Sequence, residues 1–153
     1  MAIDASFVGR VYPATPAYRV TREKIREFAT AIGDDDPAYA DVHAARALGH
    51  ADVVAPPTFA IVVTLPAGNQ VTFDPELGLD YSRVVHGEQL FVHRRPLVSG
   101  DEVQVVVHVD SIRSAGGNDI LGIRAEVATT AGEPVLTATT TLVARGTASV
   151  STA

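Results

Sequence analysis

The chain has 153 residues, of which 46% are hydrophobic and 20% charged, which fits one globular domain with a packed core. Its formal net charge of −6 disfavours a nucleic acid or an anionic membrane surface as the main partner, because both require a basic patch. Cysteine is absent from the sequence, which excludes disulfides, thiolate metal sites and a cysteine nucleophile.

The first third of the chain is predicted to contain two helices after an irregular start. Residues 7–21 carry two prolines among alternating apolar residues, which indicates irregular chain leading into a short edge strand. Thr21 is a suitable N-cap for a helix with apolar positions three and four residues apart, and Gly33 is a suitable end for it. A second, shorter helix is expected from about Val42 to Leu48.

The segment PPTFAIVVTLPAG (56–68) is apolar on nearly every side, as in a helix that is buried all round. Its β-branched residues would also suit a buried strand, so periodicity alone does not decide. Pro57 in the first turn and Pro66 at the exit favour a short central helix from about Pro57 to Ala67. The longest apolar run, 53–67, is broken by prolines and is too short to span a bilayer, and no secretory signal is recognisable. We therefore expect a cytoplasmic protein without a membrane span.

The second half of the chain reads as strands. Segments 88–98, 101–114, 118–130 and 134–145 are rich in Val, Ile and Thr and are separated by turn signals, which predicts an antiparallel meander. A buried helix plus a long antiparallel sheet indicates an α+β fold with the sheet wrapped around the helix. We expect one domain over residues 1–146 and a flexible tail at 147–153.

Four stretches of this sequence resemble the MaoC-like dehydratases, a hot-dog-fold family, in the actinobacterial branch of the mycobacterial (3R)-hydroxyacyl-ACP dehydratase subunits. They are TREKIREFATAIGDDDPAY, ARALGHADVVAPPTF, GLDYSRVVHGEQLFVHRRPLVSGDEV and TATTTLVAR, within residues 6–145. The resemblance implies a long central helix wrapped by a curved sheet, edge-to-edge pairing into a dimer, and hydration or dehydration of acyl thioesters. We expect no metal and no cofactor.

Active members of the wider family carry the signature G-D-x-N-P-x-H-x-D, whose aspartate and histidine act on one water molecule. Asp36 stands here in place of the asparagine, and Tyr39 in place of the histidine. A tyrosine with an ordinary pKa near 10 is a poor general base at neutral pH. Four positions match the signature: Gly33, Asp34, Pro37 and Asp41.

The second chemical position of the family also departs from its pattern. Active members have His-Gly at the start of the central helix, where the glycine N–H holds the thioester oxygen. This chain has Pro56-Pro57 there, and proline has no N–H. The resemblance therefore implies an acyl-binding subunit whose catalytic Asp/His pair comes from a histidine-bearing partner. The predicted substrate-binding residues are Asp36, Pro57, Thr58, Phe59, Ile61, Val62 and Gly87.

Two other functions stay open. A self-sufficient hydratase would use Asp34 with His86, which belongs to the only His-Gly pair of the sequence, or with Tyr39. The third possibility is a non-catalytic acyl-thioester binding protein. Acyl-CoA and acyl-carrier protein remain alternative carriers, and a homodimer and a heterodimer remain alternative assemblies.

Each candidate also has a structural interpretation. The acids 34–36 can form a solvated turn, Tyr39 can be a packing residue, and His86 can lie in a turn before a strand. The Arg94-Arg95 pair can bind a pantetheine phosphate or end a strand in solvent. The four remaining histidines are expected to be structural: His43, His50, His93 and His108.

Overall fold

The first helix forms where its local capping signals place it. In the computed structural model, which describes residues 3–148, α1 spans Arg22–Ile32. The Thr21 Oγ1 accepts a hydrogen bond from the N–H of Lys24 at 3.2 Å, and Gly33 ends the helix with a left-handed φ of 73°. A 3₁₀ turn at Pro37–Tyr39 leads to α2, Val42–Ala47, as predicted to within one residue.

Five antiparallel strands form one sheet in the order β1-β3-β4-β5-β2. Their bounds are Tyr18–Arg19 (β1), Val84–His93 (β2), Glu102–Ala115 (β3), Asn118–Thr129 (β4) and Pro134–Ala144 (β5). The meander prediction is confirmed for β3, β4 and β5, which tight turns connect. It is wrong for β2, which pairs with β5 on the far side of the sheet because the longer connection 94–101 lets the chain cross over.

The limits of β2 also differ from the prediction of 88–98. The strand begins at Val84 and ends at His93, before Pro96, which has no N–H for a sheet ladder. The N–H groups of both Arg94 and Arg95 instead point to the carbonyl of Val135, at 2.8 and 3.4 Å. Segment 94–98 therefore leaves the sheet as a loop.

The central helix lies further along the chain than expected. α3 spans Ile61–Thr72, whereas the prediction was Pro57–Ala67. Residues 57–60 form tight turns, and Pro66 lies inside the helix instead of at its exit. Burial explains the difference, because four-residue spacing places Val63, Ala67 and Val71 in the core and carries the helix through the proline.

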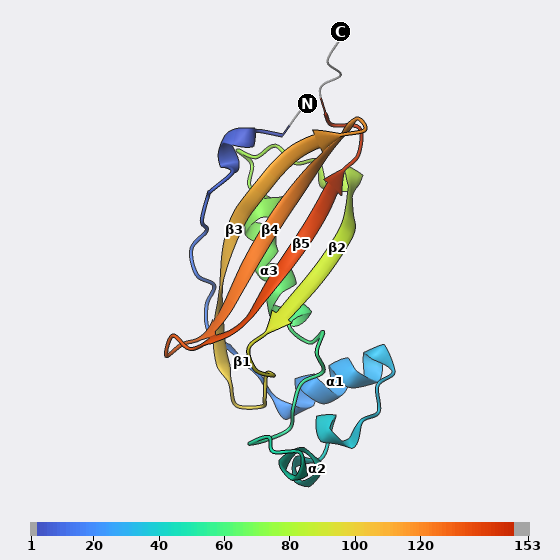
Figure 1. Cartoon of the computed structure of the whole chain (residues 1–153), viewed down its shortest axis with the longest axis vertical. Coiled ribbons are helices and arrows are strands. Elements are labelled where there is room, and N and C mark those ends of the chain that lie inside the picture. The colour runs from blue at the N-terminus through green and yellow to red at the C-terminus, as the bar shows by residue number, and fades with distance from the viewer. Residues whose placement is uncertain (1–2, 149–153) are drawn as a thin grey trace.

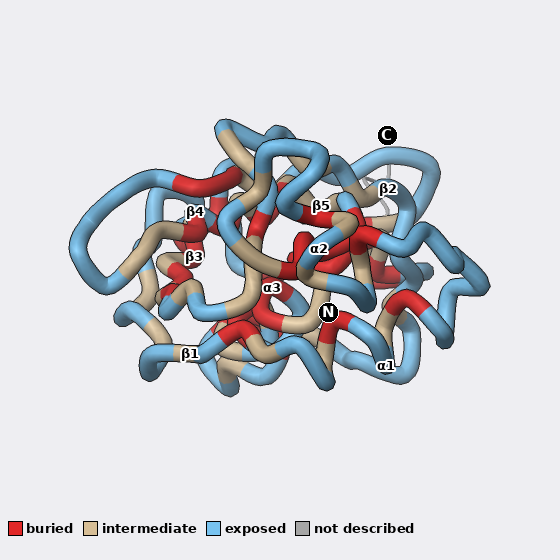
Figure 2. Tube along the Cα trace, turned by 90° about the horizontal axis from the view of Figure 1, so that it is seen from below, coloured by how far each residue is buried: buried red, intermediate tan, exposed pale blue. Residues whose placement is uncertain are grey.

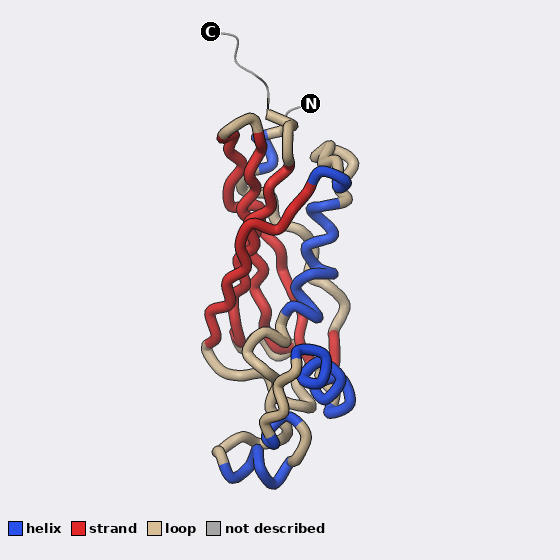
Figure 3. Tube along the Cα trace, turned by 90° about the vertical axis from the view of Figure 1, so that its right-hand side faces the viewer, coloured by secondary structure: helices blue, strands red, loops and turns tan. Residues whose placement is uncertain are grey.

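The sheet and α3 form two layers, with α1 and α2 at one end (Figures 1 and 3). The sheet curves around α3, which confirms the predicted α+β hot-dog layout. Viewed from that end, the buried residues gather between α3 and the strands, and much of α2 is exposed (Figure 2). The inner face of the sheet alternates buried residues along β3 and β4: Val103, Val105, Val107, Val109, Leu121, Ile123, Ala125 and Val127.

The two edges of the sheet differ. Residues 9–15 run along β3, where the N–H groups of Gly9, Tyr12 and Thr15 donate to strand carbonyls at 2.8–3.0 Å. No segment within residues 3–148 pairs with the outer edge of β2. None of the helices in that range is long and apolar enough to cross a membrane.

Asp119, at the start of β4, links the two ends of the domain. Its carboxylate accepts hydrogen bonds from the Ile3 N–H at 3.2 Å, the Ser114 hydroxyl at 2.6 Å and the Thr147 hydroxyl at 2.7 Å. Thr147 is 8% exposed and packs against Asp119 at this end of the domain. Residues 149–153 of the predicted tail lie outside the described residues.

Candidate functional site

The acids after α1 shape the loop that leads to α2. Asp34 Oδ1 accepts a hydrogen bond from the Asp36 N–H at 3.3 Å, and Asp36 Oδ1 accepts one from the Ala38 N–H at 2.9 Å. Asp41 caps α2 by accepting from the His43 N–H at 2.8 Å. These acids are exposed to solvent. Their carboxylates are thus used in turns and caps, which agrees with the structural interpretation of residues 34–36 as a solvated turn.

The loop and the end of β2 enclose a pocket of about 390 Å³, here called the end pocket. Tyr39 is half-buried in it, and burial raises the pKa of its phenol, with the nearby Asp34 and Asp36 carboxylates adding to the rise. The phenol is therefore protonated at neutral pH and can donate a hydrogen bond. The end pocket is lined by Asp36, Ala38, Tyr39, Leu48, His50, Val54, Ala55, Pro57, His93 and Pro96.

His93, the last residue of β2, is oriented by the turn that precedes α3. Its Nε2 lies 2.8 Å from the carbonyl oxygen of Pro57. A carbonyl only accepts hydrogen bonds, so Nε2 carries the proton and Nδ1 of the neutral ring is left as an acceptor. The second histidine of the pocket, His50, follows the glycine that ends the α2 region.

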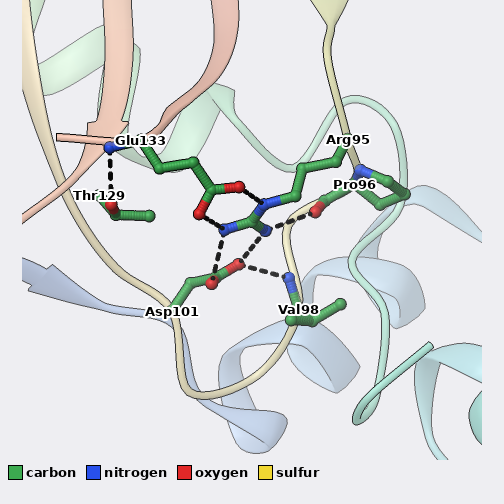
Figure 4. Close-up of polar contacts among 6 residues, drawn as sticks. All are labelled: Arg95, Pro96, Val98, Asp101, Thr129 and Glu133. Carbon is green, nitrogen blue, oxygen red and sulfur yellow. Dashed lines mark hydrogen bonds and ion pairs between the residues drawn. The ribbon is translucent and has the colours of Figure 1, made fainter. Parts of the chain in front are cut away.

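Arg95 fixes the loop beside this pocket (Figure 4). Its guanidinium makes two hydrogen bonds to the Asp101 carboxylate, at 2.9 and 3.0 Å, and two to the Glu133 carboxylate, at 2.7 and 3.4 Å. These partners raise the pKa of Arg95, and Arg95 lowers the pKa of Glu133. Asp101 also accepts from the Val98 N–H at 2.9 Å. Arg95 is therefore committed to holding segment 94–101 in place, with Pro96 against the end pocket.

Three of the predicted site residues share the end pocket: Asp36, Tyr39 and Pro57. Asp34 lies close enough to Tyr39 for its charge to act on the phenol. His86 does not join them, because it lies seven positions before His93 on β2, which is about 20 Å along an extended strand. Gly87 lies beside it in a β-bulge, where an added Cβ would be 3.3 Å from Val143 Cγ2.

The residues predicted to bind substrate along the central helix point in different directions. Phe59 is fully buried and packs edge-on against Phe28, with ring centroids 5.5 Å apart, so it belongs to the core. Ile61 faces a cavity between α3 and the sheet, whereas Val62 lines a groove of about 470 Å³ on the other side of α3. Thr58 is exposed in the turn before the helix.

His50 and His93 are pocket residues that sequence reasoning treated as structural. His93 carried one usable signal, because it lies in the same family-like stretch as the His-Gly pair, three residues before Pro96. His50 carried only its position after a helix-ending glycine. Neither signal links them to Tyr39, because the link depends on the return of β2 to the α1–α2 end of the domain.

The end pocket can hold a ligand that is partly apolar and partly hydrogen-bonding. A protonated phenol, two imidazoles and a carboxylate face walls made by alanine, leucine, valine and proline side chains. Imidazoles can exchange protons near neutral pH. Within residues 3–148, no group of three or more His, Asp or Glu side chains is placed to hold a metal ion.

A sheet curled around one helix, with a pocket between the post-α1 loop and the end of β2, defines a MaoC-like hot-dog domain. The chain belongs to the family described as FAS1-like, dehydratase domain region, whose model matches residues 6–138. It is 59% identical to a UPF0336 protein of Saccharopolyspora erythraea, over 97% of this chain and 95% of that protein. A UPF0336 protein of Streptomyces griseus is also 59% identical, over 95% of this chain and 97% of that protein.

Solved structures show the same domain. A MaoC-like dehydratase is 34% identical with a TM-score of 0.85 over 92% of this chain, and this chain spans 42% of its length. The HadBC (3R-hydroxyacyl-ACP dehydratase) complex from Mycobacterium tuberculosis contains a chain that is 31% identical, with a TM-score of 0.79, over 90% of this chain and 96% of that chain. The (R)-hydratase from A. caviae shares the fold, with a TM-score of 0.63 at 18% identity, over 88% of this chain and 94% of that chain.

Proposed function

We propose that this chain is the acyl-binding subunit of an (R)-specific 3-hydroxyacyl-thioester dehydratase, or 2-enoyl-thioester hydratase, in fatty-acid metabolism. A histidine-bearing MaoC-like partner supplies the catalytic Asp/His pair. The substrate is an acyl group on CoA or on acyl-carrier protein, and the complex acts in the cytoplasm.

The proposal depends on Tyr39, which occupies the histidine position of the family signature and keeps its phenol protonated. Removal of the α-proton of a 3-hydroxyacyl thioester needs a base, and departure of the hydroxyl needs an acid, both within hydrogen-bond reach of one site. Tyr39 stands at the family's histidine position with a raised pKa, so it can donate a proton but is a poor base. Pro57, at the second chemical position, offers no N–H for the thioester oxygen. A chain that lacks both groups needs a partner for chemistry.

The sheet edge supports such a partner. Within residues 3–148, nothing pairs with the outer edge of β2, and large apolar side chains are exposed on the same strand. Their exposed fractions are 41% for Val85, 52% for Leu90 and 58% for Val92. Pairing of β2 with the β2 strand of a partner would continue the sheet and bury these residues. The similarity to one chain of HadBC, and the span of two fifths of a MaoC-like dehydratase, agree with a domain that functions in pairs.

A second candidate is supported by the histidines of the end pocket. A self-sufficient hydratase would use His93 Nδ1 or His50 as the base and Tyr39 as the acid, because all three line one pocket. This replaces the pairing of Asp34 with His86, since β2 separates His86 from the pocket. A non-catalytic acyl-thioester binding protein is the third candidate, and its chain would bind acyl-CoA without turnover in any combination.

The test is turnover of the chain alone and mixed with a histidine-bearing MaoC-like subunit. Hydration of crotonyl-CoA and of a longer 2-enoyl-CoA is followed by the loss of ultraviolet absorbance. Activity only in the mixture, retained in the His93→Ala and His50→Ala variants of this chain, supports the proposal. Activity of the single chain that is lost in Tyr39→Phe and in either histidine variant supports the second candidate and refutes the first.

A further inference from the structure

Two buried polar atoms belong to residues that line one narrow cavity between α3 and the inner face of the sheet, here called the helix cavity. One is the hydroxyl of Thr64, a residue only 6% exposed, and the other is the side-chain nitrogen of Gln89 on β2. Neither atom finds a hydrogen-bond partner within residues 3–148. Buried polar groups in native proteins nearly always have a hydrogen-bond partner. Two buried groups without one in the same cavity therefore indicate a bound group that pairs with both.

The neighbours of these two groups fix what they present to the cavity. The Thr140 hydroxyl donates to Gln89 Oε1 at 2.7 Å, which orients the amide and leaves Nε2 as a donor into the cavity. Thr64 uses its backbone N–H for the Ala60 carbonyl at 2.9 Å, and its hydroxyl is left to rotate. An oxygen between them would accept from Gln89 and could either donate to Thr64 or accept from it.

The size and walls of the helix cavity limit the occupant. Its volume of about 30 Å³ has room for about two water-sized groups, since one needs roughly 10–15 Å³. Ile61, Leu65 and Leu142 form apolar walls beside the polar pair, and His86 also lines the cavity. An occupant must therefore be small at this point and carry an oxygen.

We propose that the helix cavity is a binding site for a hydroxyl oxygen, held between Thr64 and Gln89. The oxygen belongs to ordered water in the free protein, or to the hydroxyl of a bound 3-hydroxyacyl chain. The water source depends only on the packing of this chain. The acyl source rests on the proposed function, because it requires the acyl group to enter beside α3.

The first test measures thermal unfolding of the full chain with Thr64→Val. Loss of a hydroxyl that is hydrogen-bonded to water lowers the melting temperature by about 2–4 °C for a chain of this size. Replacing a buried hydroxyl that has no hydrogen-bond partner by a methyl group leaves stability unchanged or raises it. An unchanged or raised melting temperature therefore overturns the proposal. Thr72→Val is the reference for a buried hydroxyl with a partner in the protein, because the Thr72 hydroxyl donates to the Gly68 carbonyl at 3.2 Å, while Thr72 also lines the helix cavity.

The second test separates the two sources of the oxygen. A high-resolution crystal structure of the free protein should show water bonded to Thr64 Oγ1 and Gln89 Nε2. Binding of 3-hydroxybutyryl-CoA and butyryl-CoA is then compared in the wild type, Thr64→Val and Gln89→Leu. A preference of about fivefold for the hydroxylated ligand that both variants lose assigns the oxygen to the acyl chain. Equal affinities with water in the cavity assign it to water. An empty cavity, or one filled by a side chain of a partner subunit, overturns the proposal whatever the enzyme assays show.

Discussion

His93 Nε2 lies 2.8 Å from the carbonyl oxygen of Pro57, which joins the last residue of β2 to the turn ahead of α3. The contact brings the end of an edge strand to the start of the central helix, and Tyr39 lines the same pocket. Because the carbonyl can only accept, the contact also selects one tautomer of the imidazole.

Neutral His93 is therefore expected to carry its proton on Nε2. The imidazole ¹⁵N chemical shifts, measured above the pKa of the ring, should show one protonated nitrogen at ε2 and one unprotonated nitrogen at δ1. His43, exposed on α2, is the reference for a ring without this restraint. A spectrum in which His93 is protonated on Nδ1 would contradict the bond to Pro57.

Replacement of Arg95 should destabilise the fold more than its partial exposure suggests. Arg95→Lys loses the bidentate hydrogen bonds to Asp101, whose side chain is 13% exposed. We expect the free energy of unfolding to fall by about 2–3 kcal/mol. Glu133→Gln should cost clearly less than Arg95→Lys, because that carboxylate is 57% exposed and its ion pair is screened by solvent. Urea unfolding measures both, with the exposed neighbour variant Arg94→Lys as the control. Equal losses for Arg94→Lys and Arg95→Lys would refute the role of the network.

Asp119 should make stability depend on pH in the acid range. Hydrogen bonds from Ser114, Thr147 and Ile3 outweigh burial and lower the pKa of its carboxyl below the ordinary 3.8. The stabilisation is complete above the unfolded-state pKa and is lost as the pH falls through the lower folded-state pKa. Asp119→Asn should cost about 1–3 kcal/mol at neutral pH, and the difference from the wild type should shrink below about pH 4. Urea unfolding between pH 7 and pH 2.5 checks this. A difference that stays constant over that range would be inconsistent with the carboxylate network.

Pro66 is expected to reduce the stability of α3. It lies inside the helix, where it removes one backbone hydrogen bond, and its side chain is exposed. Pro66→Ala should raise the free energy of unfolding by about 1–2 kcal/mol, since the restored N–H and the better helix propensity exceed the entropy that proline removes from the unfolded chain. Pro57→Ala, in the turn before the helix, is the control and should not stabilise. A loss of stability in Pro66→Ala would show that α3 packs better with the proline than without it.

A charge on the open edge of β2 should prevent assembly. Leu90→Lys places an ammonium group in the surface that pairing would bury, so sedimentation should show a monomer where the wild type forms a dimer, alone or with its partner. Ile32→Lys, at the end of α1, changes the charge equally at a side chain that is 48% exposed. Loss of assembly in both variants, or in neither, would place the interface elsewhere.

The sequence by itself determined the features that depend on neighbouring residues. Thr21 and Gly33 delimit α1 because caps act within one helical turn, and the turns between β3, β4 and β5 are set by their own glycines. The fold class also followed from the sequence, since a buried helix next to long alternating strands has few ways to form one core. The departure of Tyr39 from the family signature was visible in the sequence.

Only the tertiary structure decided which distant residues meet. The pairing of β2 with β5 places His93, and not His86, beside Tyr39, and no local pattern encodes that choice. The extension of α3 through Pro66 depends on burial against the sheet, which outweighs the propensity of the proline. Pockets are formed by segments that are far apart in sequence and close only after packing, so periodicity identified the elements of this protein but not the side chains that share its sites.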